Sequence, residues 1–235
     1  MKISCSKYII LLLILPFYVL FAYQSIAEIT NVIGQVYCSN HRGNSDCYRY
    51  DDAQKLIVHS GKSLHEGDKI FVMQKGKANI VFRNGNTIKQ INGEIEIDPD
   101  EVTIENGFFQ GFFKMNKSYL GDSFFTLNSK PILVRIKRGE FFFKFKENTY
   151  SESKSTDLRL APGIYLEKGE AEVYKKGDCF IGFLLCEDTI MLKEGEKIVF
   201  RDFQVTKMSQ EELSQLHLMK YECSTTSPDV GCTVE

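Results

Sequence analysis

The sequence predicts an all-β protein of repetitive antiparallel or coiled β-structure, either a β-sandwich or β-solenoid-like, with one short C-terminal helix. Two observations predict this class. Apolar and polar residues alternate within residues 64–98, with the period of a half-buried strand. A glycine followed by an acid also precedes an alternating segment repeatedly, at irregular intervals that suit β-coils carrying insertions. These pairs are Gly67-Asp68, Gly93-Glu94, Gly139-Glu140, Gly169-Glu170 and Gly195-Glu196.

The chain opens with an apolar segment. Two lysines precede an apolar run over residues 8–23, and Ser25 and Ala27 are small residues at the positions that a signal peptidase recognises. A helix of that run would reach about 24 Å, short of the roughly 30 Å hydrocarbon core of a bilayer. We therefore predict a signal peptide over residues 1–27, cleaved after Ala27, and a periplasmic or secreted protein. An uncleaved helix that anchors the chain in the inner membrane is the alternative.

Charge argues against a nucleic-acid partner. The chain has 29 basic and 31 acidic residues, and residues 1–27 hold two of the lysines and no acid. The exported part would therefore carry 27 basic and 31 acidic residues, a net charge near −4. Basic and acidic residues are interleaved, whereas phosphate binding needs basic residues gathered in a patch.

Six cysteines remain beyond the predicted signal, and they form three couples that are close in sequence. In an oxidising compartment we expect each couple to form a disulfide, and each small loop to contribute about 2.5–3 kcal/mol in the chain-entropy model. Other pairings are formally open. No couple has the Cys-x-x-Cys spacing and the four histidines are scattered, so we predict no metal site. The predicted disulfides are Cys38–Cys47, Cys179–Cys186 and Cys223–Cys232.

Residues 64–98 predict a β-meander whose central hairpin turns at Asn84-Gly85. We favour a three-residue loop with Gly85 in the left-handed region, because this loop places Ile80 opposite Ile88 and joins apolar side chains on one face. A two-residue loop would instead place Val81 opposite Ile88.

The same segment resembles the FecR domain, an extracytoplasmic module. The resemblance continues over residues 134–141 and 166–173, so it spans residues 64–173. Two residues depart from the family pattern, because Glu140 replaces the usual threonine and Gln90 stands where an aliphatic residue is expected. The matching blocks of the meander are Leu64, Gly67-Asp68-Lys69-Ile70, Gly76, Ala78-Asn79-Ile80-Val81-Phe82, Asn84-Gly85-Asn86-Thr87-Ile88 and Ile95-Glu96-Ile97.

The resemblance implies a role in the cell envelope. FecR-type proteins relay the occupancy of an outer-membrane transporter through a periplasmic domain and a membrane helix to a cytoplasmic sigma factor. Here only the periplasmic module is similar, because residues 1–7 are too short for the cytoplasmic domain. We expect a stand-alone exported domain that binds an envelope protein or a cell-wall polymer, in signalling or envelope organisation. An anchored component of a FecR-type signalling system is the alternative, and an envelope glycan hydrolase is the second alternative.

The sequence has no familiar catalytic or cofactor motif. It contains no Gly-x-Ser-x-Gly, His-Glu-x-x-His or phosphate-binding loop, so we predict no enzyme and no cofactor. Asp98, Asp100 and Glu101 surround Pro99 and suggest calcium, but the common calcium loop also needs a glycine and a later glutamate at set positions. A solvated turn explains the same three acids.

Phenylalanines are concentrated in residues 107–145 and often occur in pairs. Adjacent strand residues point to opposite faces of a sheet, so one ring of each pair needs its own cover. Residues 141–143 suggest a strand covered on both faces, which predicts burial. The alternative is an apolar patch for a partner, with Phe108 and Phe112 as its candidate residues.

The C-terminal part has a different pattern. Residues 147–157 are polar and predict an exposed loop or a hinge. Residues 209–212 can cap and begin a helix. We therefore divide the exported chain into a β-domain over residues 28–205 and a helix with a disulfide-closed tail over residues 206–235. The helix would dock through Leu213, Leu216 and Met219.

Overall fold

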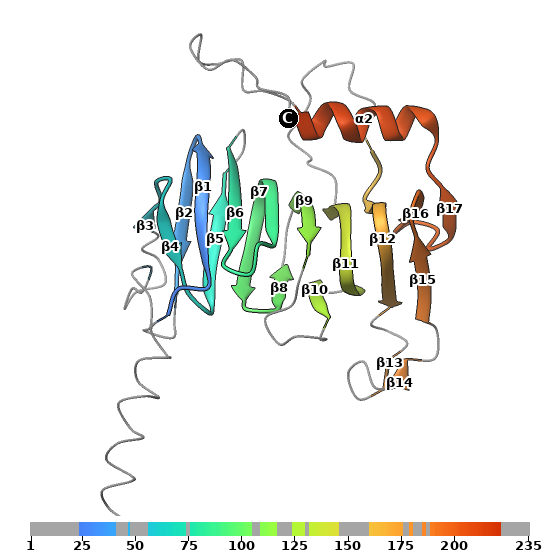
Figure 1. Cartoon of the computed structure of the whole chain (residues 1–235), viewed down its shortest axis with the longest axis horizontal. Coiled ribbons are helices and arrows are strands. Elements are labelled where there is room, and N and C mark those ends of the chain that lie inside the picture. The colour runs from blue at the N-terminus through green and yellow to red at the C-terminus, as the bar shows by residue number, and fades with distance from the viewer. Residues whose placement is uncertain are drawn as a thin grey trace, which may run out of the picture.

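In the part of the chain that it describes, the computed structural model shows strands β1 to β17 and helix α2, so the predicted all-β class with a short C-terminal helix is confirmed (Figure 1). It describes residues 24–40, 47, 56–73, 76–104, 109–116, 124–129, 132–145, 160–175, 179–180, 185–186 and 189–221. The first strands are β1 (Ala27–Ile33), β2 (Val36–Ser39), β3 (Leu56–Ile57), β4 (Lys62–Leu64), β5 (Asp68–Val72), β6 (Lys77–Phe82), β7 (Thr87–Asp98), β8 (Glu101–Ile104) and β9 (Phe109–Met115). The remaining elements are β10 (Phe125–Ser129), β11 (Ile132–Phe145), β12 (Gly163–Lys175), β13 (Cys179–Phe180), β14 (Leu185–Cys186), β15 (Thr189–Lys193), β16 (Glu196–Val199), β17 (Val205–Lys207) and α2 (Gln210–Tyr221).

Three long strands, β7, β11 and β12, change neighbours halfway along their length. The first half of β7 pairs with β6 and β9, and its second half pairs with β5 and β8. In β11, residues 133–136 pair with β10, whereas residues 139–145 pair with β9. In β12, residues 163–165 pair with β16 and residues 170–174 with β15. Each long strand therefore belongs to two sheet layers.

The register separates the main sheet into these two layers. The first layer runs β4-β1-β6-β7-β9-β11-β12-β16-β17, and the second runs β3-β2-β5-β7-β8-β10-β11-β12-β15. Side chains from both layers, such as Ile29 of β1 and Ile70 of β5, belong to one continuous apolar cluster. Figure 1 shows the strands ranked from the N-terminal end to the C-terminal end, with α2 beside the C-terminal half. The main core thus lies between the layers of a coiled sandwich.

The five glycine–acid pairs mark the places where the chain passes from one layer to the other. Gly93 and Gly169 lie at the midpoints of β7 and β12, with φ of 114° and 90°. Only glycine adopts such a φ without strain. Gly139 lies at the midpoint of β11, while Gly67 and Gly195 join β4 to β5 and β15 to β16. The predicted β-coils are therefore crossings between two layers.

The β6–β7 hairpin has the predicted register. Ile80 lies opposite Ile88, and Gly85 adopts φ 85°. The Phe82 amide donates to the Asn86 carbonyl at 2.8 Å, which closes the three-residue loop. The preference for the longer loop is confirmed.

The predicted cleavage site lies at the start of β1. Ala27 is the first residue of that strand and is 3% exposed. The Ile26 amide donates to the Leu64 carbonyl, and the Ile26 carbonyl accepts from the Arg83 amide. Cleavage after Ala27 would remove these contacts, and the cleavage itself stays a prediction. Residues 1–23 lie outside the described ranges, and no helix within those ranges is long and apolar enough to cross a membrane.

Candidate functional site

The paired phenylalanines of β9 and β11 divide between the two faces of the first layer. Phe113 and Phe141 point into the main core, where their rings stack with centroids 4.7 Å apart. Phe112 and Phe142, their neighbours in sequence, point to the opposite face, with centroids 4.8 Å apart. The outward pair therefore needs a cover of its own, as the sequence pattern indicates.

Helix α2 provides this cover. The predicted docking residues lie where expected, because Leu216 is fully buried and Leu213 and Met219 pack beside it. Phe112 is only 5% exposed, which agrees with the predicted burial and not with the alternative of an exposed partner surface. Phe108, the other candidate, lies outside the described residues. The covered cluster consists of Phe112, Phe142, Leu160, Tyr165, Met208 and Leu216.

Ser209 and Glu212 form the predicted capping box at the start of α2. The Glu212 amide donates to Ser209 Oγ at 3.1 Å, and the Ser209 amide donates to Glu212 Oε2 at 2.8 Å. Lys197 of β16 donates to Glu212 Oε1 and ties this end of the helix to the sheet. Burial raises the pKa of the Glu212 carboxyl, but the hydrogen bonds from Lys197 and Ser209 outweigh it and leave the pKa below its usual value.

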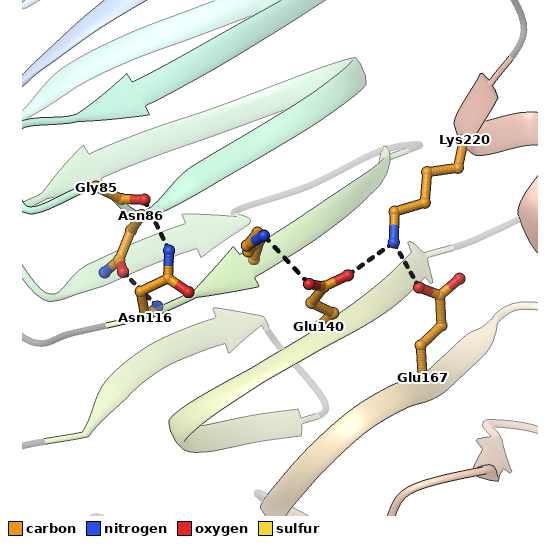
Figure 2. Close-up of polar contacts among 7 residues, drawn as sticks. Gly85, Asn86, Asn116, Glu140, Glu167 and Lys220 are labelled. Atoms are coloured by element: carbon orange, nitrogen blue, oxygen red, sulfur yellow. Dashed lines mark hydrogen bonds and ion pairs between the residues drawn. The ribbon is translucent and has the colours of Figure 1, made fainter. Parts of the chain in front are cut away.

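Lys220 fixes the other end of the helix. Its ammonium donates to Glu140 Oε2 of β11 at 2.8 Å and to Glu167 Oε2 of β12 at 2.7 Å, so one cation joins two strands to the helix (Figure 2). The Glu167 side chain is 8% exposed, and Lys114 Nζ lies 3.3 Å from Glu140 Oε1. Glu140 thus has a structural role, because its carboxylate holds the end of the helix.

The charges of this cluster stabilise one another. Burial raises the pKa of the Glu140 carboxyl, but the ammonium groups of Lys220 and Lys114 outweigh it, and the pKa lies below its usual value of 4.5. Burial likewise lowers the pKa of Lys220, but the two carboxylates outweigh it and raise the pKa above 10.5. Glu140 and Lys220 are therefore both charged over the neutral range.

Replacing Lys220 by Met should reduce the free energy of unfolding at neutral pH by about 1–3 kcal/mol, because two carboxylates lose their cation. The contribution of Glu140 to stability exists above about pH 4.5 and is lost as the pH falls through its lowered folded-state pKa. The contribution of Lys220 exists below about pH 10.5 and is lost as the pH rises through its raised folded-state pKa. Lys220→Met should therefore lessen the loss of stability in acid.

Urea unfolding across the acid range measures this dependence. Lys89→Met is the matched control, because Lys89 is an exposed lysine on the same layer. It should leave both the stability and its dependence on pH unchanged within about 0.5 kcal/mol. If the free energy of unfolding of Lys220→Met fell in acid as steeply as that of the wild-type protein, the assignment of the cluster would be contradicted.

A second polar contact fixes the end of β9. The Asn86 side chain is fully buried, and its Oδ1 accepts from the Asn116 amide at 2.8 Å. Asn116 Nδ2 in turn donates to the Gly85 carbonyl at 3.2 Å (Figure 2). These contacts hold the end of β9 against the hairpin turn.

The predicted disulfide Cys38–Cys47 is present, with its two Cα atoms 5.5 Å apart. Strands β13 and β14 pair so that Cys179 lies opposite Cys186, but the side chains of these two residues lie outside the described part. Cys223 and Cys232 also lie outside it.

Peptide mapping without reduction should find all three local disulfides. Removing the Cys38–Cys47 disulfide by the double change to Ser should lower the free energy of unfolding by about 2.5–3 kcal/mol in the chain-entropy model. A disulfide between cysteines of different couples, or free thiols throughout the oxidised protein, would contradict the local pairing.

The acid of the first glycine–acid pair is buried beside this disulfide. Asp68 is fully buried, and its carboxylate accepts from Asn40 Nδ2 at 2.6 Å and from the His65 amide at 2.8 Å. Asn40 follows β2, which carries Cys38. Asp68 therefore fixes the crossing at Gly67 and the start of the disulfide-closed loop together.

Glu101, one of the acids near Pro99, has partners within the protein. Glu101 Oε1 accepts from Asn128 Nδ2 at 2.6 Å and from Thr103 Oγ1 at 3.2 Å. Among the residues that the structure describes, no group of three or more His, Cys, Asp or Glu side chains could hold a metal ion.

Among known proteins, similarity to this chain was found only in solved structures. No family model matches the chain, and no curated protein matches it. Two crystal structures from Parabacteroides distasonis ATCC 8503, each described as a "putative anti-sigma factor", are similar, with 14% and 15% identity and a TM-score of 0.43 each. The similar regions cover 64% and 66% of this chain and 63% and 65% of those chains, so the chain spans less than two thirds of their length. The FecR resemblance stays a prediction.

Proposed function

We propose that this chain is an exported, non-catalytic domain that binds a protein of the cell envelope, with a cell-wall polymer as the alternative ligand. The Cys38–Cys47 disulfide is the observation that supports export best, because disulfides persist in oxidising compartments. The FecR-like pattern of residues 64–173 supports the same compartment and a role in signalling or envelope organisation.

A sheet edge beside the disulfide favours a protein as the ligand. Strand β3 is the last strand of the second layer and pairs only with β2 among the described strands. Ile57 of β3 is 60% exposed and lies opposite Tyr37, which lies opposite Phe71 of β5. Residues opposite one another share a sheet face, so these three form an outward apolar row. An edge strand beside such a row can accept a further strand from a partner.

Capture experiments test the proposal. The purified protein should retain an envelope protein from envelope extracts, and Ile57→Glu should weaken this capture by about tenfold or more, as expected for a central contact residue. Val81→Glu is the matched control. Val81 is 40% exposed, but it lies on β6, which pairs with β1 and β7 and is therefore not an edge strand. Equal loss in both variants would contradict the edge as the contact surface.

A parallel assay on purified cell-wall polymer separates the remaining alternatives. Binding to the polymer without fragment release would identify the alternative ligand. Release of soluble fragments would contradict the non-catalytic proposal and favour the glycan hydrolase.

N-terminal sequencing tests export. We expect the mature chain to begin at Glu28 in the periplasmic fraction, because Ala27 ends the predicted signal. An intact Met1 in a membrane fraction would favour the anchored signalling component.

A further inference from the structure

We propose that two copies of this chain exchange their C-terminal elements and form a domain-swapped dimer. The exchanged segment is β17 with α2, residues 205–221, and the occupant of each docking face is the same segment of the second copy. This proposal is independent of the partner at the β3 edge, because it concerns the opposite end of the sheet.

Most of the docking face lies outside the exchanged segment, because Phe112, Phe142, Leu160 and Tyr165 belong to the rest of the chain and only Met208 and Leu216 to the segment. The apolar cluster under α2 shares no residue with the main core, which lies on the other face of the same layer. Strand β17 pairs only with β16 among the described strands, and its three residues are exposed. The segment is therefore a peripheral element added to a formed sandwich, which is the kind of element that proteins exchange at low cost.

Every contact of the segment could form equally between two copies. Lys197 reaches Glu212 at the start of the helix, and Glu140 and Glu167 reach Lys220 at its end. Leu216 is fully buried in the apolar cluster. Because the second copy offers an identical segment, it meets the same charges and the same apolar surface.

The link that would open is short and strained. It joins Val199, the last residue of β16, to Val205, the first residue of β17. Within it Phe203 adopts φ 51°, an uncommon conformation for a residue other than glycine, while its amide donates to the Val199 carbonyl at 2.9 Å. The Phe203 ring packs on the main core, and Lys175 Nζ lies 5.8 Å from its centroid, which helps to hold the turn. Short strained links favour exchange, because an extended link relieves the strain.

Light scattering after gel filtration, over a range of concentrations, measures the dimer directly. The wild-type protein should form a dimer as its concentration rises. Phe203→Gly removes the strain from the closed turn and should lower the association constant by about tenfold or more, since each dimer relieves two turns.

Two control variants separate strain from other effects. Phe203→Leu loses the ring but keeps a side chain at the same φ, so its dimer should persist. Asn31→Gly relieves a similar φ of 48° in β1, far from the link, and should leave the association constant unchanged. A wild-type protein that is monomeric at every concentration, or a dimer that Phe203→Gly leaves unchanged, would overturn the proposal.

A mixing experiment distinguishes exchange from simple association. In the Lys220→Glu chain, the new carboxylate faces Glu140 and Glu167 of its own sheet. In the Glu140→Lys chain, the new ammonium faces Lys220 of its own helix. In an exchanged heterodimer, each altered group meets an opposite charge from the second chain. The two variants, mixed after mild unfolding and refolding, should form heterodimers in clear excess over homodimers. A merely statistical mixture would contradict the exchange of the helix.

Discussion

Gly169→Ala should destabilise the protein by about 4 kcal/mol or more, which is exceptional for a single substitution. Gly169 adopts φ 90° where β12 crosses between the layers. A Cβ atom at this position would lie 2.3 Å from the Arg138 carbonyl oxygen and 3.0 Å from Gly139 Cα. Both atoms belong to the backbone of β11, so the two longest paired strands would have to separate at their midpoints. Urea unfolding of the purified variant measures the loss.

Gly195→Ala is the matched control for this prediction. Gly195 also marks a crossing and adopts φ 79°, but nothing lies within 4 Å of a Cβ atom added there. Only the cost of the left-handed conformation should remain, about 1–2 kcal/mol. If both variants lost the same stability, the close approach of β11 and β12 would not be the cause.

Phe112→Ala should lower the free energy of unfolding by about 3–5 kcal/mol, the usual cost of removing a buried phenylalanine ring. The Phe112 ring lies 4.8 Å from that of Phe142 and beneath α2. Its loss removes contacts with the sheet and with the helix together. Thermal and urea unfolding should both report the change.

Leu218→Ala provides the control, because Leu218 belongs to the same helix but is 71% exposed. Its loss should stay within about 0.5 kcal/mol. A stable Phe112→Ala variant that had lost capture of an envelope partner would instead restore Phe112 as a contact residue.

Local pattern predicts the hairpins and the helix well. Alternation within residues 78–88, with one tight turn, places Ile80 opposite Ile88 because the burial of one face selects a single register. The capping box at Ser209 is likewise encoded within four consecutive residues. Both features depend only on neighbours in sequence.

The features that depend on distant residues could not be predicted. Alternation shows that Phe112 and Phe113 face opposite ways, but it cannot show that the C-terminal helix covers Phe112. The ion pairs of Lys220 join residues 80 and 53 positions apart, and no local spacing marks them. In the sequence, only the mismatch of Glu140 with the FecR-like pattern sets one of these residues apart. The role of the glycine–acid pairs as crossings could not be predicted either, because it depends on which strands pair on either side of each glycine.

The three strands that belong to both layers also bear on how the molecule unfolds. A sandwich of two separate sheets can lose one sheet while the other persists. Here β7, β11 and β12 continue from one layer into the other, so separating the layers would break the pairing of β7 with four neighbours and of β11 and β12 with three each. Loss of strand pairing in one layer should therefore disturb the pairing in the other layer through the shared strands. Amide protons at both ends of β11 should exchange with solvent through one common opening of the structure. We therefore expect the sandwich to unfold as a single cooperative unit.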